Sequence, residues 1–292
     1  MDADRSASRT AVLVCQGRAA AHGRLAVDRF SDPIALELLR NGERAVVEQV
    51  RAGVPPQGWR QRLDYELVAA TAEGMVPRTV AIDDAVRGRP GSQLVILGAG
   101  LDARAWRMPE LARTFVFEVD HPASQRDKRD RLGPLPPLAA TLRFVPVDFS
   151  RDQLDPALAA AGHDPGHPTT WLWEGVVVYL TREQVRAGLG EIRSRSAPGS
   201  RLIVNYQHPS LTAVAGRLVM RSLSGLTRRA DPLAGEPRRS AWTPRAMATL
   251  LGSHGFRVGS DDDLLSLAGR LPIEVRHRRS LRDGRVLVAD LP

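Results

Sequence analysis

A glycine-rich loop is the first feature of the sequence that could do chemistry. Gly98 and Gly100 follow an apolar run at residues 94–97. The string Gly98-x-Gly100-x-x-Ala103 matches the dinucleotide-binding fingerprint, and Asp120 follows at the spacing of about 20 residues that this fingerprint requires. Glycine lets the backbone adopt positive φ and pass close to a ligand. We therefore expect this loop to bind a nucleotide or a nucleoside cofactor.

Two cofactor classes compete for the loop: a dinucleotide such as NAD(P) or FAD, and S-adenosylmethionine. A carboxylate at Asp102 would repel a pyrophosphate at this helix start, whereas an ammonium and a sulfonium would tolerate it. Asp120 could accept hydrogen bonds from both ribose hydroxyls, and Asp148 ends the next strand, within reach of an adenine amino group. Each aspartate alone could be a helix N-cap. Together they favour a ligand site with Gly98, Gly100 and Asp102.

Strand-like and helical segments alternate after residue 91. Alternation of this kind predicts βαβ units and a parallel sheet that is covered by helices on both faces. The expected strands are 94–97, 114–119, 142–147, 169–178 and 201–206, and the expected helices between them are 121–132, 151–161 and 182–196.

The flanking regions differ from this alternation. Residues 19–86 show helical periodicity, with a helix over 34–39 started by Asp32 and Pro33, and Pro77 predicts a kink or a break. We expect a helix from Pro244 with Thr243 as its N-cap, and a helical insert that could form a lid at 209–240. Terminal strands are expected at 256–258, 274–276 and 285–289.

Composition excludes several classes of protein. The chain has 292 residues, a formal net charge of +8 and one cysteine, Cys15, so it is not a disulfide scaffold. Lys128 is the only lysine among 41 basic residues, and the arginines are spread along the chain. This resembles the codon bias of a GC-rich genome more than a nucleic-acid-binding face. We find no membrane span, secretory signal or metal-ligand pattern, and we expect a cytoplasmic protein.

The motifs together resemble the leucine carboxyl methyltransferase family. They read VILGAGLDARAWRM, FEVDHP, VPVDF and WLWEGVVVYLTREQ, with further similarity in RAAAHGRLAVDRFSDPIALELL, VPRTVAIDDAV and RLIVNYQHP. The resemblance is clear over roughly residues 10–210. It implies an α/β fold of the Rossmann-like class I methyltransferase type, with a seven-stranded, mostly parallel sheet. It also implies a helical cap at 13–90 and a methyltransferase domain at 91–292. Residues 1–12 are small, polar and charged, and we expect them to be disordered.

The resemblance also implies contacts with S-adenosylmethionine. Arg78 matches the arginine that pairs with the cofactor carboxylate, and Gly98 lies under the methionine moiety. Glu174 matches the acid that meets the cofactor ammonium. Because Glu174 lies between apolar residues, a positively charged partner is expected for it. The positions that match the nucleoside contacts are Asp120 for the ribose, and Asp148 and Phe149 around the adenine.

The family includes bacterial and polyketide O-methyltransferases, so we expect methyl transfer to oxygen. The expected acceptor is a carboxylate or hydroxyl of a small natural product or a peptide. A carboxylate needs no base, whereas a phenol would profit from one. Tyr179, Tyr206 and His208 are the candidates for that base.

Two alternatives remain open. An NAD(P)-dependent oxidoreductase would typically need a Tyr/Lys pair, which is hard to build with Lys128 alone. A non-catalytic protein on the same fold would be expected to have lost cofactor residues, yet each position named above holds a usable one.

Overall fold

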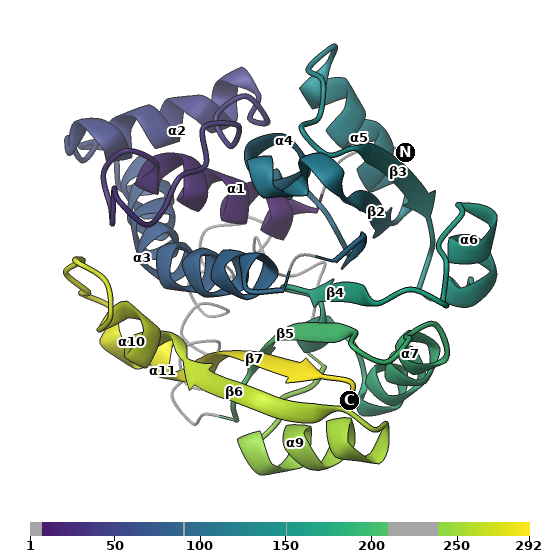
Figure 1. The fold of residues 1–292 in the computed structure, drawn as a ribbon. Helices are drawn as coiled ribbons and strands as arrows, with labels where there is room; N and C mark the ends of the chain where they lie inside the picture. Colours follow the sequence, from purple (N-terminus) through teal and green to yellow (C-terminus); the bar gives the residue numbers. More distant parts are fainter. Residues whose placement is uncertain (1–7, 90, 150, 210–238) are drawn as a thin grey trace.

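One seven-stranded sheet forms the centre of the chain (Figure 1). A computed structural model describes residues 8–89, 91–149, 151–209 and 239–292. The strand order is β3-β2-β1-β4-β5-β7-β6, and β7 is antiparallel to both of its neighbours. The strands are β1 (Gln93–Leu97), β2 (Phe115–Asp120), β3 (Thr141–Pro146), β4 (Thr169–Trp173), β5 (Arg201–Gln207), β6 (Arg257–Asp263) and β7 (Gly284–Asp290). The mostly parallel, Rossmann-like sheet expected from the sequence is confirmed.

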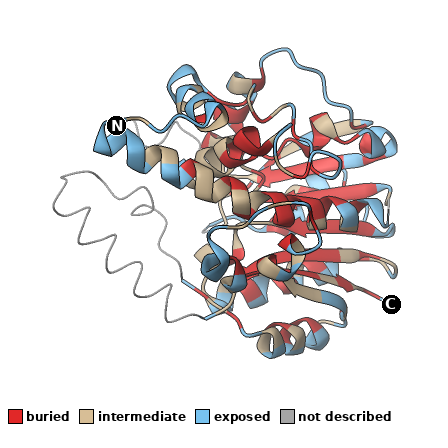
Figure 2. Cartoon of the chain, turned by 90° about the vertical axis from the view of Figure 1, so that its left-hand side faces the viewer, coloured by how far each residue is buried: buried red, intermediate tan, exposed pale blue. Residues whose placement is uncertain are grey.

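The central strands β1 and β4 are buried along their whole length because both of their faces are covered. Every residue of β1 and of β4 is buried, and Figure 2 shows the strands as the most buried part of the molecule. Side chains alternate across the sheet, so Leu94 and Ile96 pack into one hydrophobic cluster while Val95 and Leu97 pack into another. A strand in this position reads as an unbroken hydrophobic run.

Helices cover the two faces of the sheet. One face carries α6 (Leu154–Ala160), α7 (Arg182–Ser194) and α9 (Pro244–Ser253). The other carries α1 (Arg9–Ala21), α2 (Asn41–Ala52), α3 (Trp59–Arg87), α4 (Arg104–Arg107), α5 (Pro122–Leu132), α10 (Leu264–Ala268) and α11 (Arg278–Asp283). The 3₁₀ turns η1 (Pro109–Arg113) and η2 (Val177–Tyr179) follow α4 and β4.

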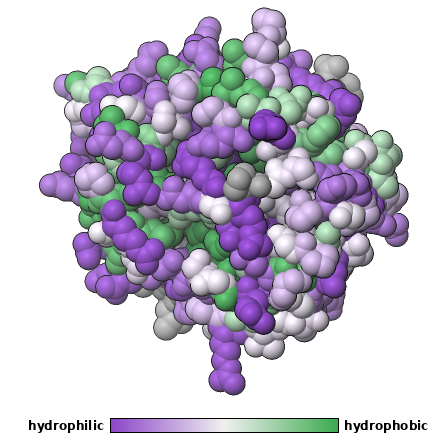
Figure 3. Space-filling model, viewed as in Figure 1, coloured by the Kyte–Doolittle hydropathy of each residue, from purple (hydrophilic) through white to green (hydrophobic). Residues whose placement is uncertain are grey.

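Neither the face in Figure 3 nor any described helix presents a long apolar stretch. Hydrophobic residues on the face in Figure 3 lie in separate small areas among hydrophilic ones. Within the described ranges, no helix combines the length and the apolar character needed to cross a lipid bilayer.

Of the kink or break expected at Pro77, helix α3 excludes the break. The helix continues through Pro77 as one element of 29 residues. Proline removes one backbone hydrogen bond, but the buried side chains of Val76, Val80 and Ile82 hold this part of α3 against the sheet. Tertiary packing therefore outweighs the local preference.

Other local expectations were also wrong. Residues 34–39 form turns and not a helix, although the Asp32 carboxylate caps them by accepting from Ala35 N at 3.0 Å. Residues 9–12, expected to be disordered, begin α1, because the Ser8 hydroxyl accepts from two backbone N–H groups of its first turn. The segment 274–276 is not a strand, and β4 ends at Trp173.

Two other expectations concern the last third of the chain. Thr243 does cap α9, where its hydroxyl accepts from Ala246 N at 3.2 Å. The expected insert at 209–240 lies almost entirely outside the described residues, because the structure does not describe 210–238.

Candidate functional site

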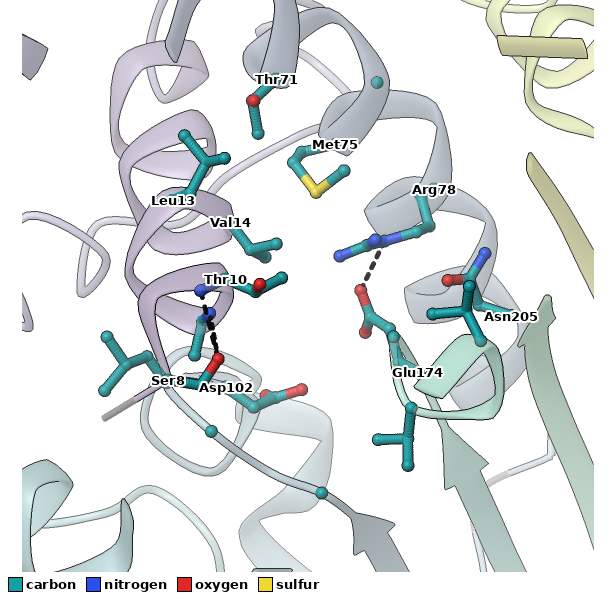
Figure 4. Close-up of a pocket in the computed structure, with 18 of the residues that line it drawn as sticks. Ser8, Thr10, Leu13, Val14, Thr71, Met75, Arg78, Asp102, Glu174 and Asn205 are labelled. Atoms are coloured by element: carbon teal, nitrogen blue, oxygen red, sulfur yellow. Dashed lines mark hydrogen bonds and ion pairs between the residues drawn. The ribbon is translucent and has the colours of Figure 1, made fainter. Parts of the chain in front are cut away.

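A cavity of about 630 Å³ lies where the carboxyl ends of the parallel strands meet helices α1 and α3 (Figure 4). Residues that directly follow or end a strand line its floor: Gly98 after β1, Asp120 at the end of β2, Glu174 after β4 and Gln207 at the end of β5. Its volume is that of a typical small-molecule site, and the carboxyl edge of an open α/β sheet is where such folds bind ligands.

The glycine loop requires glycine for packing as well as for conformation. Gly98 has φ of +66°, and a Cβ atom there would lie 2.3 Å from Cγ2 of Val176. Gly100 has φ of +48°, and its N–H donates to Oδ2 of Asp120. Oδ1 of Asp120 accepts from His121 N at 2.6 Å. Both carboxylate oxygens of Asp120 are therefore fixed by backbone groups, and the side chain lines the cavity.

Glu174 has the positively charged partners that its burial demands. Its Oε1 lies 2.7 Å from Nε of Arg78, and its Oε2 accepts from Nη1 of Arg104 at 2.8 Å. Burial alone would raise the pKa of Glu174, but the guanidinium groups of Arg104 and Arg78 lower it below its ordinary value. Figure 4 shows the Arg78 guanidinium facing the cavity beside Glu174. The two residues lie together, as expected from their motifs.

Asp102 is held in the same way. Its carboxylate accepts from the Arg104 backbone N–H at 2.7 Å and contacts the guanidinium of the same residue. Burial would raise the pKa of Asp102, yet Arg104 and Arg18 bring it well below its ordinary range. The carboxylate therefore stays ionised at the edge of the cavity.

These contacts belong to a larger buried ion network. Arg104 and Arg107 both pair with Asp83, at 2.8 Å and 2.7 Å, and Asp32 lies 3.0 Å from Arg18 and 3.5 Å from Arg107. The network comprises four arginines and four carboxylates: Arg18, Arg78, Arg104, Arg107, Asp32, Asp83, Asp102 and Glu174. It joins α1 and α3 to the loops after β1 and β4.

Sequence reasoning missed two residues of this network at the site. Arg18 lines the cavity from α1, and its Nη2 donates to the carbonyl of Leu101. Arg104 lies behind Asp102 and Glu174. The Asp102-x-Arg104 motif was a usable signal for Arg104. Arg18 is the first residue of RAAAHGRLAVDRFSDPIALELL, a segment that also resembles the family, but an arginine followed by three alanines does not indicate what the side chain contacts.

Only one of the two residues expected around the adenine lines the cavity. Phe149 lines the cavity, whereas Asp148 does not. The Asp148 carboxylate lies 2.6 Å from Nη2 of Arg151 and 3.9 Å from Nε2 of His121.

Of the three candidate bases, only Tyr179 lines the cavity. Tyr206 was a wrong choice, because its side chain packs on the opposite face of β5 and its hydroxyl donates to Asp261 Oδ2 at 2.6 Å. Burial and Asp261 raise the pKa of Tyr206 further above its ordinary value. Asn205 and Gln207, its neighbours in the strand, face the cavity instead. His208 is not among the lining residues, and its backbone N–H donates to the carbonyl of Asp283.

The charge of the lining can be compared with that of a cofactor. The charged side chains that line the cavity in the described chain are Arg18, Arg78, Asp102, Asp120 and Glu174. With all five ionised, they carry one net negative charge. S-adenosylmethionine, with a sulfonium, an ammonium and a carboxylate, carries one net positive charge. A dinucleotide with its pyrophosphate would bring negative charge to a site that is already negative.

Comparison with known proteins decides the assignment. The sequence pattern of the family described as leucine carboxyl methyltransferase matches residues 11–193, which is more than half of the chain. The chain belongs to this family. It is therefore an S-adenosylmethionine-dependent methyltransferase, and the cofactor expected from the sequence is confirmed. The alternative of an NAD(P)-dependent oxidoreductase is therefore rejected, although the glycine loop matches the dinucleotide-binding fingerprint.

Bacterial relatives agree with this assignment. A protein of Mycolicibacterium gilvum, named as an S-adenosyl-L-methionine-dependent methyltransferase, is 36% identical over 215 residues, covering 70% of this chain and 67% of the relative. A Mycolicibacterium paratuberculosis protein with the same name is 36% identical over 220 residues, covering 72% and 70%.

Solved structures show the same fold at low sequence identity. A Thermobifida fusca crystal structure, named as a methyltransferase, gives a TM-score of 0.59 at 16% identity, covering 99% of this chain and 96% of that one. A protein of the duf574 family from Streptomyces avermitilis gives 0.56 at 13% identity, covering 93% and 98%.

Proposed function

We propose that the chain transfers the methyl group of S-adenosylmethionine to a carboxylate oxygen of a small-molecule or peptide acceptor. One observation carries the choice of oxygen. From the lining residues that are not assigned to the cofactor, we take Leu67, Thr71, Met75, Tyr179, Gln207 and Leu281 as the part that receives the acceptor, and we call this part the acceptor half. Among the described residues of this half, the only side chain that could act as a base is the Tyr179 hydroxyl, and no His, Lys, Asp, Glu or Cys lines it. A carboxylate is ionised near pH 7 and needs no base.

The cofactor residues divide the work of holding S-adenosylmethionine. We assign the amino acid moiety to Arg78 and Glu174, and the ribose hydroxyls to Asp120. The adenine lies near Phe149 and Asp148 in this proposal. Gly98, Gly100 and Asp102 form the wall of the loop beside it.

The bound cofactor supplies an electrophilic methyl on a positively charged sulfur. The protein has to align the acceptor oxygen with that methyl and keep water out. The Gln207 amide can donate a hydrogen bond that orients a carboxylate, while Leu67, Met75 and Leu281 exclude water. Tyr206 and His208 have no part in this mechanism.

Arg78→Ala should weaken binding of the intact cofactor roughly 10- to 100-fold, because a bidentate charge-assisted contact is lost. Glu174 keeps Arg104 as a partner, so the fold should persist. Calorimetric titration with S-adenosylhomocysteine and with 5′-methylthioadenosine, which lacks the amino acid moiety, checks the assignment. Only the first ligand should lose affinity, and Arg78→Lys should recover part of it. Equal losses for both ligands would remove Arg78 from this role.

Tyr179→Phe should change the rate of methyl transfer to a carboxylic acid by less than about threefold, because no proton has to be removed. The test is incubation with isotope-labelled S-adenosylmethionine and a panel of carboxylic acids and phenols, followed by mass spectrometry and base hydrolysis of the products. Base-labile methyl esters are expected. Exclusive formation of aryl methyl ethers, together with a loss of more than 100-fold in Tyr179→Phe, would instead make Tyr179 a base and the acceptor a phenol.

A further inference from the structure

One row of side chains on α3 runs from solvent into the acceptor half of the cavity. The row has a spacing of four residues and consists of Trp59, Leu63, Leu67, Thr71 and Met75. Residues at this spacing are neighbours on a helix surface and form a continuous ridge. The last three members line the cavity, and Figure 4 shows Thr71 and Met75 on its wall, above Arg78.

The outer members of the row are exposed although they are large and apolar. Trp59 is 54% exposed and Leu63 is 53% exposed. At 1.5 Å of rise per residue, the row extends about 24 Å from Trp59 to Met75. Each step of four residues turns the side-chain direction by about 40° round the helix axis. Ala70 and Met75 both line the cavity, and the direction of Leu63 lies between theirs. Leu63 is therefore on the side of α3 that faces the cavity.

None of the charged side chains of the cavity belongs to the acceptor half. Every charged side chain that lines it in the described chain belongs to the positions assigned to the cofactor or, for Arg18, to the buried ion network beside them. An acceptor with a charged body would lose hydration in the acceptor half without gaining an ionic partner there. An apolar body would lose nothing by entering it, and it would also cover Leu67 and Leu63.

We propose that the acceptor is an elongated carboxylic acid whose body is an apolar chain. This inference rests on the proposed carboxylate methylation. The carboxylate lies inside the cavity, where the sulfonium of the bound cofactor would offset its charge, and the chain leaves along α3 past Met75 and Leu67 to cover Leu63 and Trp59. A carboxylate oxygen forms a bond with the methyl carbon as the bond between that carbon and sulfur breaks. The electron pair of the broken bond stays on sulfur, which becomes a neutral thioether. The product is a neutral methyl ester.

Gly74 lies beside this path. It lines the cavity, and a Cβ atom at Gly74 would have nothing within 4 Å apart from its own stretch of helix. A larger side chain would therefore enter the cavity without meeting backbone. Because glycine is a poor helix former, Gly74→Leu should leave α3 intact while filling the path.

The experiment measures binding of straight-chain carboxylic acids from hexanoate to hexadecanoate, by calorimetry, to protein saturated with S-adenosylhomocysteine. Affinity should rise roughly two- to fourfold per methylene until the chain reaches the end of the row. Leu63→Ser and Trp59→Ser should each lower the affinity for hexadecanoate about fivefold or more and leave hexanoate unchanged. Gly74→Leu should abolish binding of both acids and keep S-adenosylhomocysteine affinity within threefold.

Phe115→Ser is the matched control, because Phe115 is 50% exposed at the start of β2 and does not line the cavity. Equal affinity for all chain lengths would overturn the inference, as would equal effects of Leu63→Ser and Phe115→Ser. A dimer that Trp59→Ser converts to a monomer, with acid binding unchanged, would assign the row to a second copy of the chain. If binding depends on chain length but no acid yields a methyl ester, the proposed carboxylate methylation is rejected, and the inferred binding of an apolar chain along α3 is retained.

Discussion

Replacing Asp120 with alanine is expected to lower the affinity for S-adenosylmethionine at least 100-fold. The assigned ribose hydroxyls would lose a charged acceptor, and each such hydrogen bond contributes about 1.5–3 kcal/mol. The substitution also frees the N–H groups of Gly100 and His121, which now donate to the carboxylate. The loop that contacts the cofactor therefore loses its anchor at the same time. Calorimetric titration with S-adenosylhomocysteine measures the loss.

The control for this variant is Asp130→Ala, which removes an exposed carboxylate of α5. It should bind the cofactor normally. Thermal unfolding should show that both variants are folded. Near-wild-type affinity in Asp120→Ala would reject the ribose assignment.

Lys128→Met is expected to lower the free energy of unfolding by about 3–5 kcal/mol, because it leaves a buried carboxylate without its partner. Nζ of Lys128 lies 2.5 Å from Oε2 of Glu118, and both side chains are fully buried. The ammonium also lies 4.9 Å from the centre of the Trp106 ring. Chemical denaturation at pH 7 measures the effect. The double variant Glu118→Leu with Lys128→Met removes both charges and should recover most of the stability.

The same pair predicts a dependence on pH. Burial raises the pKa of Glu118 from an ordinary value of 4.5 to about 7, despite Lys128. A carboxyl with a raised pKa in the folded state stabilises the fold at low pH, and this contribution is lost as pH rises through the folded pKa. Without Lys128 the folded pKa should rise further. The destabilisation of Lys128→Met should therefore be larger at pH 8 than at pH 6, and the double variant should show no such increase. If the stability difference between the wild type and Lys128→Met does not depend on pH, Glu118 is not the group responsible.

The sequence predicted the sheet well because its strands carry two redundant signals. Residues 94–97 of β1 form an unbroken apolar run, and Gly98 follows it with a conformation and a packing that exclude other residues. Glu174 was predictable in the same way, since a carboxylate between apolar residues needs a cation. These are local constraints, and local constraints can be read from neighbours in the chain.

Predictions failed where long-range packing decides the outcome. The alternation along β5 places Asn205 and Gln207 at the cavity and Tyr206 on the other face, and a shift of one residue in register reverses that choice. The sequence did not define which face of β5 meets the cavity. Pro77 was expected to interrupt α3, but the sheet against which it packs cannot be inferred from neighbouring residues.

The buried ion network has a consequence for how the chain can be divided. A cut near residue 90 separates the helical N-terminal part from the sheet in the sequence, yet it divides the network into two sets of two arginines and two carboxylates. In each piece alone, charged side chains would lose the oppositely charged partners that the other piece supplies, such as Glu174 for Arg78. The two parts should therefore not fold autonomously. A chimera that exchanges the N-terminal helices between relatives would have to exchange the charges facing them on the loops after β1 and β4 as well.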